Sequence, residues 1–381
     1  MPTTRSRINR MTESRRTGQT SSPSPSSSHN DTSTTTTPYS QNLEQNLIDH
    51  QIYPPLYQGQ DNSDDENEPN NIGEIRRRLA ATRPSLDPST FSKAEYHQFR
   101  KANWAAKKEA DVTASVFPFI EGTNGTTSSS RQQYVSRDTR FTNLAPLTDG
   151  TISQAKPDIS YGARPEQLDR EIRNQLSDRV IPSANDRLSL APNFRVEVKG
   201  PGGAPRVAVR QACYYGALGV RAMDALQSYE PARDQQGSQQ QSLGPELRSV
   251  SDNNAYAVTA TYSSGILNLY TSHSTMSTTT PNQDVSQRRP EYIMTPLRSF
   301  ALINGVESFC AGAAAYRNAR DWTGEVRDGA IARANGRLTE ARASRARGRG
   351  GEPGLDSVIE QEEEGEAEGE EVDPFSGTRL N

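Results

Sequence analysis

The segment FRVEVKGPGG, residues 194–203, has the composition of a β-strand that stops abruptly. Its first part is β-rich, and the glycines and proline of residues 200–203 form a strong stop signal. Alternate side chains of a strand share one face, so Glu197 and Lys199 point the same way while Val198 faces the opposite layer. The segment therefore predicts a carboxylate and an amine held side by side at a strand end, where the active groups of α/β sheets collect.

A second acid stands earlier in the chain, in the segment KPDI, residues 156–159. Asp158 lies 39 positions before Glu197, and a helix is expected between them at residues 165–179. Two carboxylates and a lysine suit metal-dependent phosphodiester hydrolysis, in which oxygen ligands hold the ion and an amine offsets developing negative charge. Taken singly, Asp158 could cap or turn a loop after Pro157, and Lys199 could be a solvated strand residue. Their joint occurrence, in this order, favours the nuclease interpretation.

The motifs resemble those of the PD-(D/E)XK nuclease superfamily, and more closely those of fungal proteins of unassigned role that carry KPDI, VEVKG and RQACYYGALG segments. The resemblance covers about residues 95–335. It implies that Asp158 and Glu197 bind Mg²⁺ or Mn²⁺, that Val198 offers its backbone carbonyl, and that Lys199 orients or stabilises the attacking water. The substrate that it implies is a nucleic acid, with DNA preferred.

Two further features extend the resemblance. A helix expected at about residues 207–229 places Gln211 and Tyr215 on one face, which is similar to the Gln-x-x-x-Tyr element of the RecB-type branch, where the glutamine faces the metal site. An ordinary polar helix face is the alternative. Many members place an extra acid in a helix ahead of the aspartate, and Glu109 is the expected equivalent, with Glu121 in reserve.

The fold class expected is α/β, a restriction-endonuclease-like mixed sheet flanked by helices, with long disordered N- and C-terminal tails. Only 32% of the chain is hydrophobic, so much of it cannot be core. Residues 1–74 are expected to be a disordered tail with a short apolar motif at 42–57, which could be a docking motif, a strap over the domain or a transient helix. The nuclease-like domain is expected at 75–335, with a disordered insertion at 231–251. Residues 336–381 are expected to form a disordered Arg/Gly and then acidic tail.

Hydrophobic patterns inside this domain predict three further features. They are a helix at 92–108 with Ser92 as its cap and Trp104 among its apolar contacts, a hairpin of 255–262 with 266–272, and a long helix at 296–334.

Composition argues against several other classes of protein. The two cysteines imply no disulfide framework, and the four scattered histidines give little support to a zinc site or a Ser-His-Asp triad. Because the chain has neither an apolar N-terminal stretch nor a run of about 18 apolar residues, neither secretion nor membrane spanning is expected. An intracellular location follows. Basic clusters at residues 5–16 and 76–78 could be a nuclear address or a phosphate contact, although the net charge is only −4.

Two alternatives to a nuclease remain open at this point, and one of them is an intrinsically disordered scaffold with a small structural core, in which the VEVKG strand would be incidental. The chain could be a catalytically silent nuclease-fold protein that acts as a nucleic-acid-binding or protein-interaction platform, with partners held through residues 42–57 or through the tails. The arginines of residues 333–349 could contact phosphate in competition with the acidic run at 360–373, or both blocks could be solvated without a specific role. Convergence of Asp158, Glu197 and Lys199 in the fold is what the nuclease interpretation requires.

Overall fold

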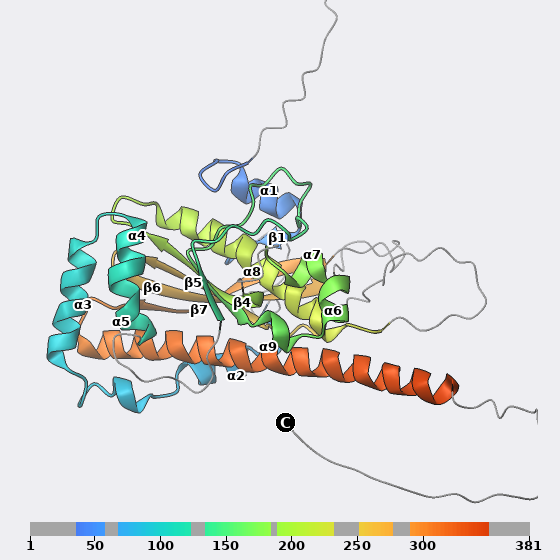
Figure 1. Cartoon of the computed structure of the whole chain (residues 1–381). Coiled ribbons are helices and arrows are strands. Elements are labelled where there is room, and N and C mark those ends of the chain that lie inside the picture. The colour runs from blue at the N-terminus through green and yellow to red at the C-terminus, as the bar shows by residue number, and fades with distance from the viewer. Residues whose placement is uncertain are drawn as a thin grey trace, which may run out of the picture.

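The protein has an α/β fold in the computed structural model, which describes residues 36–57, 68–122, 134–183, 189–231, 251–276 and 290–349. In these residues a seven-stranded mixed sheet is flanked by helices (Figure 1). The strands are β1 (Ile52–Tyr53), β2 (Tyr134–Arg137), β3 (Ile159–Ala163), β4 (Leu190–Lys199), β5 (Ala257–Ser263), β6 (Ile266–Met276) and β7 (Pro290–Ala301).

The sheet runs in the order β1-β7-β6-β5-β4-β3-β2. Strand β4 is parallel to β5 and β1 is parallel to β7, while the other neighbours are antiparallel. A parallel pair needs a crossover, and helix α8 (Pro205–Gln227) supplies it between β4 and β5. All ten residues of β4 are buried, because helices cover both faces of the sheet there.

Helix α8 lies on one face of the sheet, and the long helix α9 (Val306–Arg349) crosses the other (Figure 1). The remaining helical segments are α1 (Leu43–Asp49), α2 (Ile72–Leu79), α3 (Lys93–Ala105), α4 (Glu109–Asp111), a π-helical stretch (Val112–Val116), α5 (Phe117–Glu121), α6 (Arg170–Gln175) and α7 (Ser177–Val180), with short 3₁₀ turns at Pro84–Leu86 and Pro165–Gln167.

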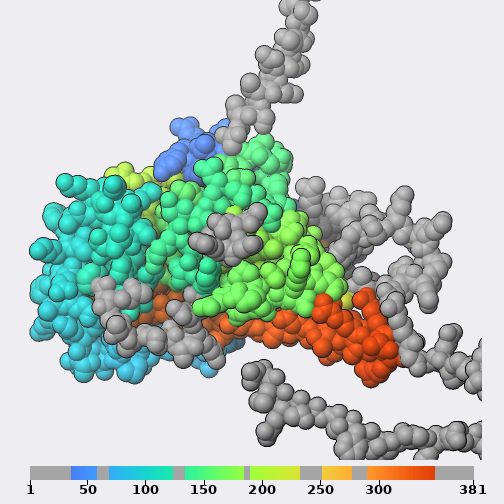
Figure 2. All heavy atoms as spheres, in the orientation of Figure 1, coloured from blue at the N-terminus to red at the C-terminus, as the bar shows by residue number. Residues whose placement is uncertain are grey.

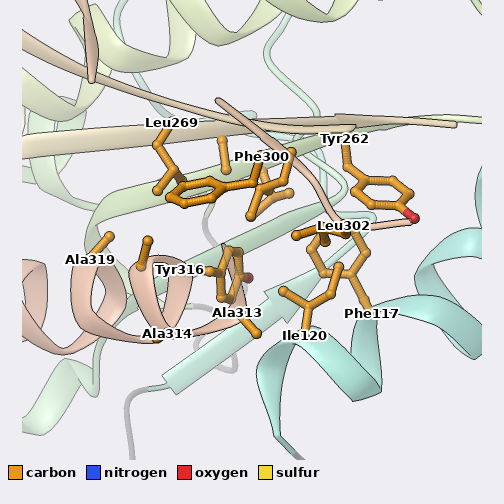
Figure 3. Close-up of a cluster of buried hydrophobic side chains, with 14 of the residues drawn as sticks. Phe117, Ile120, Tyr262, Leu269, Phe300, Leu302, Ala313, Ala314, Tyr316 and Ala319 are labelled. Atoms are coloured by element: carbon orange, nitrogen blue, oxygen red, sulfur yellow. The ribbon is translucent and has the colours of Figure 1, made fainter. Parts of the chain in front are cut away.

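The largest hydrophobic cluster lies between the sheet and α9 (Figure 3). Phe117 and Ile120 of α5 meet Tyr316 of α9 and Tyr262 of β5 in this cluster. Val196 and Val198 belong to it as well, so the even-numbered residues of β4 face α9. Arg195 instead donates a hydrogen bond to the backbone carbonyl of Tyr215 in α8. From residue 195 onwards the odd-numbered residues of β4 therefore face α8, as strand alternation predicts. Earlier in the strand, the side chain of Asn193 donates a hydrogen bond to the carbonyl of Thr323 in α9.

Several predicted elements are confirmed. Helix α3 begins after Ser92, whose hydroxyl accepts a hydrogen bond from the Glu95 amide as a cap should. Helix α8 spans the predicted region. Strands β5 and β6 form the predicted hairpin, and Ser264 and Gly265 both have positive φ, as a two-residue turn of this kind requires.

The N-terminal boundary of the domain, expected at residue 75, is wrong. Helix α1 and strand β1 belong to the fold, because Leu43, Leu47 and Ile52 are buried against α8 and β1 pairs with β7. Of the three alternatives for residues 42–57, the strap over the domain is the one that the structure shows. Figure 2 shows this segment in blue on the surface of the domain.

The C-terminal boundary is also corrected, since helix α9 continues through residues 336–349, where disorder was expected. Leu338 is buried, and Arg337 donates hydrogen bonds to the carbonyls of Leu226 and Gln227 at the end of α8. Arg342 pairs with Asp169 at the start of α6. These arginines hold helices together, which local composition could not indicate.

Three smaller predictions are wrong. Residues 296–301 belong to β7 and not to a helix, since they pair with β6. The helix expected at 165–179 is broken into a 3₁₀ turn and the short helices α6 and α7. Trp104, expected to make apolar contacts, is 91% exposed.

The other disorder predictions, for residues 1–35, 58–67, 232–250 and 350–381, lie outside the described residues, as do the N-terminal basic cluster and the acidic run. Across the described ranges, no helix has both the length and the apolar character that crossing a bilayer would require.

The role of residues 43–53 in the fold can be tested at Leu47. Leu47→Ala should lower the free energy of unfolding by about 2–5 kcal/mol, because it opens a cavity in the cluster under α1. Denaturant titration measures the change. Gln45→Ala, on the exposed side of the same helix, is the control and should change stability by less than about 0.5 kcal/mol. Equal midpoints for Leu47→Ala and wild type would show that this segment does not unfold with the domain.

Candidate active site

The two predicted carboxylates converge where β3 begins and β4 ends. Ile159 pairs with Val196, so Asp158, one residue earlier, lies beside the end of β4. The backbone amide of Val198 donates a hydrogen bond of 2.7 Å to Oδ2 of Asp158. Asp158 is half-buried, and Glu197 is almost completely buried. Antiparallel pairing of β3 and β4 thus brings together two acids that lie far apart in the sequence.

Lys199 completes a cluster of charges with these acids. Its Nζ lies 3.7 Å from Oε2 of Glu197 and 3.1 Å from Oε1 of Glu109, which helix α4 contributes. The lysine side chain is only 2% exposed, whereas that of Glu109 is 40% exposed. The ammonium group therefore sits between a buried carboxylate of the strand and a more accessible carboxylate of α4.

Glycines after Lys199 allow the chain to close over it. A Cβ atom on Gly203 would lie 2.9 Å from Cβ of Lys199, and one on Gly200 would lie 3.0 Å from Cα of Lys108. Neither position has room for a side chain without movement of a neighbour. The stop signal that ends the strand is therefore also the segment that buries Lys199 and packs against the start of α4.

Helix α8 supports the segment that carries Asp158. The hydroxyl of Tyr215 accepts a hydrogen bond of 3.1 Å from the backbone amide of Lys156, two residues before Asp158. Gln211 makes a side-chain hydrogen bond with Tyr215, and its Oε1 is buried without a partner among the described residues. Tyr215 is thus a positioning residue, while Gln211 offers a free acceptor on the same helix face.

Burial and mutual repulsion perturb the acids. Burial raises the pKa of Asp158 to about 6, against the opposing effects of the Val198 amide and the Lys199 charge. Burial and then the charge of Asp158 raise the pKa of Glu197 well above its usual range. For Lys199, burial alone would lower the pKa, but the charges of Glu197 and Glu109 outweigh it and the pKa is raised. Lys199 thus stays protonated, and Asp158 and Glu197 resist being ionised together.

The donor chemistry of this cluster fits a divalent cation of the Mg²⁺ type. Carboxylate oxygens are its preferred protein ligands, and Oε1 of Glu197 is buried with no hydrogen-bond partner in the described structure. A cation would also relieve the repulsion between Asp158 and Glu197. Among the described residues, however, no set of three or more His, Cys, Asp or Glu side chains is arranged to hold a metal. Only Asp158 and Glu197 of this cluster are placed to bind a metal, because the carboxylate of Glu109 pairs with Lys199.

Most sequence-predicted site residues lie together. Asp158, Glu197, Lys199 and Glu109 form one charged cluster, and Tyr215 lies close enough for the charges of Glu197 and Asp158 to act on its hydroxyl. The reserve acid Glu121 is not part of it. Glu121 is buried elsewhere, where it forms an ion pair of 2.6 Å with Arg137 and accepts a hydrogen bond from the hydroxyl of Tyr161.

Sequence reasoning missed two contributors. The exposed carboxylate of Asp138 helps to raise the pKa of Asp158 and pairs with Lys156 at 2.7 Å. Its backbone amide also donates to the carbonyl of Asp158. Asp138 follows β2 directly, so its proximity depends on the pairing of β2 with β3, for which the sequence carried no signal. The amide of Val198 was missed as well, because the resemblance assigns a role only to its carbonyl.

Comparison of the chain with protein-family models, with curated proteins and with solved structures finds no match.

The raised pKa of Asp158 leads to a prediction about stability and pH. The carboxyl group titrates near 6 in the folded state and near 3.8 otherwise, so the folded state binds more protons within this window and stability falls as the pH rises through it. Asp158→Asn should therefore stabilise the metal-free protein at about pH 7, by on the order of 1–3 kcal/mol, and the gain should vanish near pH 4.

Thermal unfolding with a chelator present, at a series of pH values, measures this effect. Asp49→Asn, on the exposed surface of α1, is the matched control and should show no such gain. A loss of stability in Asp158→Asn at neutral pH would contradict the electrostatic account of the site.

Proposed function

We propose that the protein is a metal-dependent nuclease of the PD-(D/E)XK type that hydrolyses phosphodiester bonds, with DNA as the preferred substrate. The observation that carries the proposal is the convergence of Asp158, Glu197 and Lys199, predicted from the sequence, at one end of the sheet. The restriction-endonuclease-like fold is part of the same proposal. It is supported by the run α5-β2-β3-β4-α8-β5, in which three antiparallel strands are followed by a helix and a parallel strand.

Each residue has a role that follows from its surroundings. Asp158 and Glu197 would hold a Mg²⁺ or Mn²⁺ ion, with the backbone of Val198 as the third contributor that the resemblance implies. When bound, such an ion polarises the phosphate and lowers the pKa of water. Lys199 stays charged because Glu197 and Glu109 flank it, and it can therefore offset negative charge that develops on the phosphate. The free Oε1 of Gln211 can accept a hydrogen bond from the attacking water.

A catalytically silent platform is the second candidate, and one observation favours it. The ammonium of Lys199 already balances part of the negative charge of Glu197 and Glu109 without a metal. A site of this kind can be stable with no ion at all, and the fold would then serve only to bind a nucleic acid or a protein.

Three substitutions separate the two candidates. Lys199→Ala should keep metal binding and reduce cleavage by about 10²-fold or more, because it removes a charge that acts mainly in the transition state. Asp158→Ala and Glu197→Ala should lose both metal binding and cleavage. Nicking or degradation of single- and double-stranded DNA with Mg²⁺ or Mn²⁺, paired with calorimetric metal titration, gives the two measurements.

Lys93→Ala and Glu74→Ala, both on exposed helix surfaces, are matched controls that should behave as wild type in both assays. Wild-type protein that binds the ion but cleaves neither DNA nor RNA would establish the platform. Cleavage by Lys199→Ala at the wild-type rate would remove the role given to Lys199.

A further inference from the structure

Trp104 stands out because a tryptophan rarely lies so open to solvent. Its side chain is 91% exposed at the C-terminal end of α3, whereas the other tryptophan, Trp322, is 3% exposed in the core. Tryptophan is usually well buried because its large ring gains most from leaving water. The side chain of Trp104 thus contributes little to the core, and its ring is accessible to a partner.

Cations surround this ring. Arg100 and Lys101 precede Trp104 by four and three residues and so share its helix face, and Lys107 and Lys108 follow it. We call these five residues the basic ridge. All five are exposed, and none of the four cations forms an ion pair with any residue that the structure describes.

Acids near the ridge are engaged elsewhere. Glu95 of α3 lies on the opposite side, near Arg317 of α9, where burial lowers the pKa of Arg317 to about 10 and the charge of Glu95 acts against that shift. The carboxylate of Asp111 accepts hydrogen bonds from the backbone amides of Lys107 and Lys108 at 3.0 and 3.2 Å, which leaves both amines free. The ridge therefore presents positive charge beside an aromatic surface.

The ridge leads directly to the candidate active site. The backbone of Lys108 packs against Gly200, and the next residue, Glu109, contacts Lys199. Trp104 is four residues from Lys108, so a distance of at most about 14 Å separates them. Figure 1 shows α3, α4 and the start of α8 at the same end of the molecule, and Figure 2 shows the surface of residues 68–122, blue to teal, at that end.

Cations beside an exposed ring match the needs of an unpaired nucleotide strand. Phosphates bind the amines, and a base with no partner can stack on the indole, an interaction that tolerates any sequence. A duplex could use the cations but not the ring, since its bases are already stacked. An anionic lipid surface would also attract cations and a tryptophan, but it has no reason to lie beside a carboxylate cluster.

We propose that the basic ridge binds an unpaired segment of nucleic acid, with a base stacked on Trp104 and the backbone directed by Lys107 and Lys108 towards Asp158, Glu197 and Lys199. The inference rests on the proposed function for the direction of the strand. The preferred substrate is then single-stranded nucleic acid, or a strand end or flap next to a duplex.

Intrinsic fluorescence of the full chain in chelator tests this without cleavage. A thymidine oligonucleotide of about 12 nucleotides should quench wild-type emission, because Trp104 is accessible and Trp322 is not. Trp104→Ala should abolish the quenching and weaken binding, measured by anisotropy of a labelled oligonucleotide, by at least about fivefold. Trp104→Tyr should restore affinity, since a tyrosine ring also stacks. Because Trp104 is exposed, Trp104→Ala should melt at the wild-type temperature.

Charge and stacking can be separated. Lys101→Gln should keep the quenching and lower the slope of log affinity against log salt by about 0.7 for a single strand. Wild type should bind the oligonucleotide more tightly than a blunt duplex of the same length. Two results would each overturn the inference. In the first, Trp104→Ala binds the oligonucleotide and the duplex with the same affinities as wild type does. In the second, the fluorescence of wild type changes with anionic vesicles but not with the oligonucleotide.

Failure of the basic ridge and failure of the nuclease proposal can be distinguished, because the binding experiments do not depend on cleavage. Stacking on Trp104 without hydrolysis would remove the nuclease proposal and leave the basic ridge as a binding surface. Hydrolysis that is indifferent to Trp104 would remove the ridge and leave the nuclease.

Discussion

Strand β4 carries three charged side chains into the interior, and much of the structure around it makes this possible. Arg195, Glu197 and Lys199 all point to the α8 face and are almost completely buried. Removal of a charge from water costs several kcal/mol unless a partner compensates. Glu197 and Glu109 more than offset the burial of Lys199, whose pKa is raised, but the pKa of Glu197 is also raised by burial and that of Arg195 is lowered by burial to about 9, so compensation of these two charges is incomplete. A strand selected for stability alone would carry apolar residues here.

One residue of α8 links the two halves of the site. The backbone carbonyl of Tyr215 accepts a hydrogen bond from Arg195, and its hydroxyl accepts one from the amide of Lys156. The same residue therefore restrains β4 through its main chain and the segment before Asp158 through its side chain. Movement of α8 by a fraction of a helical turn would disturb both acids at once. Precise placement of the site thus depends on the crossover helix as much as on the strands.

The sequence predicted features that local patterns decide, and it failed where distant contacts decide. Alternation along β4, the Ser92 cap, the hairpin turn and helix α8 all follow from short-range chemistry. The order of the motifs on either side of a long insertion predicted that Asp158 and Glu197 lie together, and they do. The strand at residues 296–301 owes its form to pairing with β6, and the arginine-rich end of α9 owes its order to contacts with α8 and α6. The composition of residues 336–349 is typical of a disordered segment, because a short stretch of sequence does not reveal its tertiary contacts.

The pairing of β1 with β7 has a consequence for the order in which the protein acquires its structure. Ile52 lies in register with Tyr292, whose amide donates a hydrogen bond to the carbonyl of Gln51, so the first strand of the sheet meets the last one. During synthesis β1 leaves the ribosome long before its partner strand β7 has been made, and α1 leaves the ribosome together with β1. The outer edge of the sheet therefore closes only after almost the whole domain has been translated, which makes closure a late and nonlocal step. Leu43, Leu47 and Ile52 can be covered once α8 has been made, but until β7 follows, β1 has no strand to pair with.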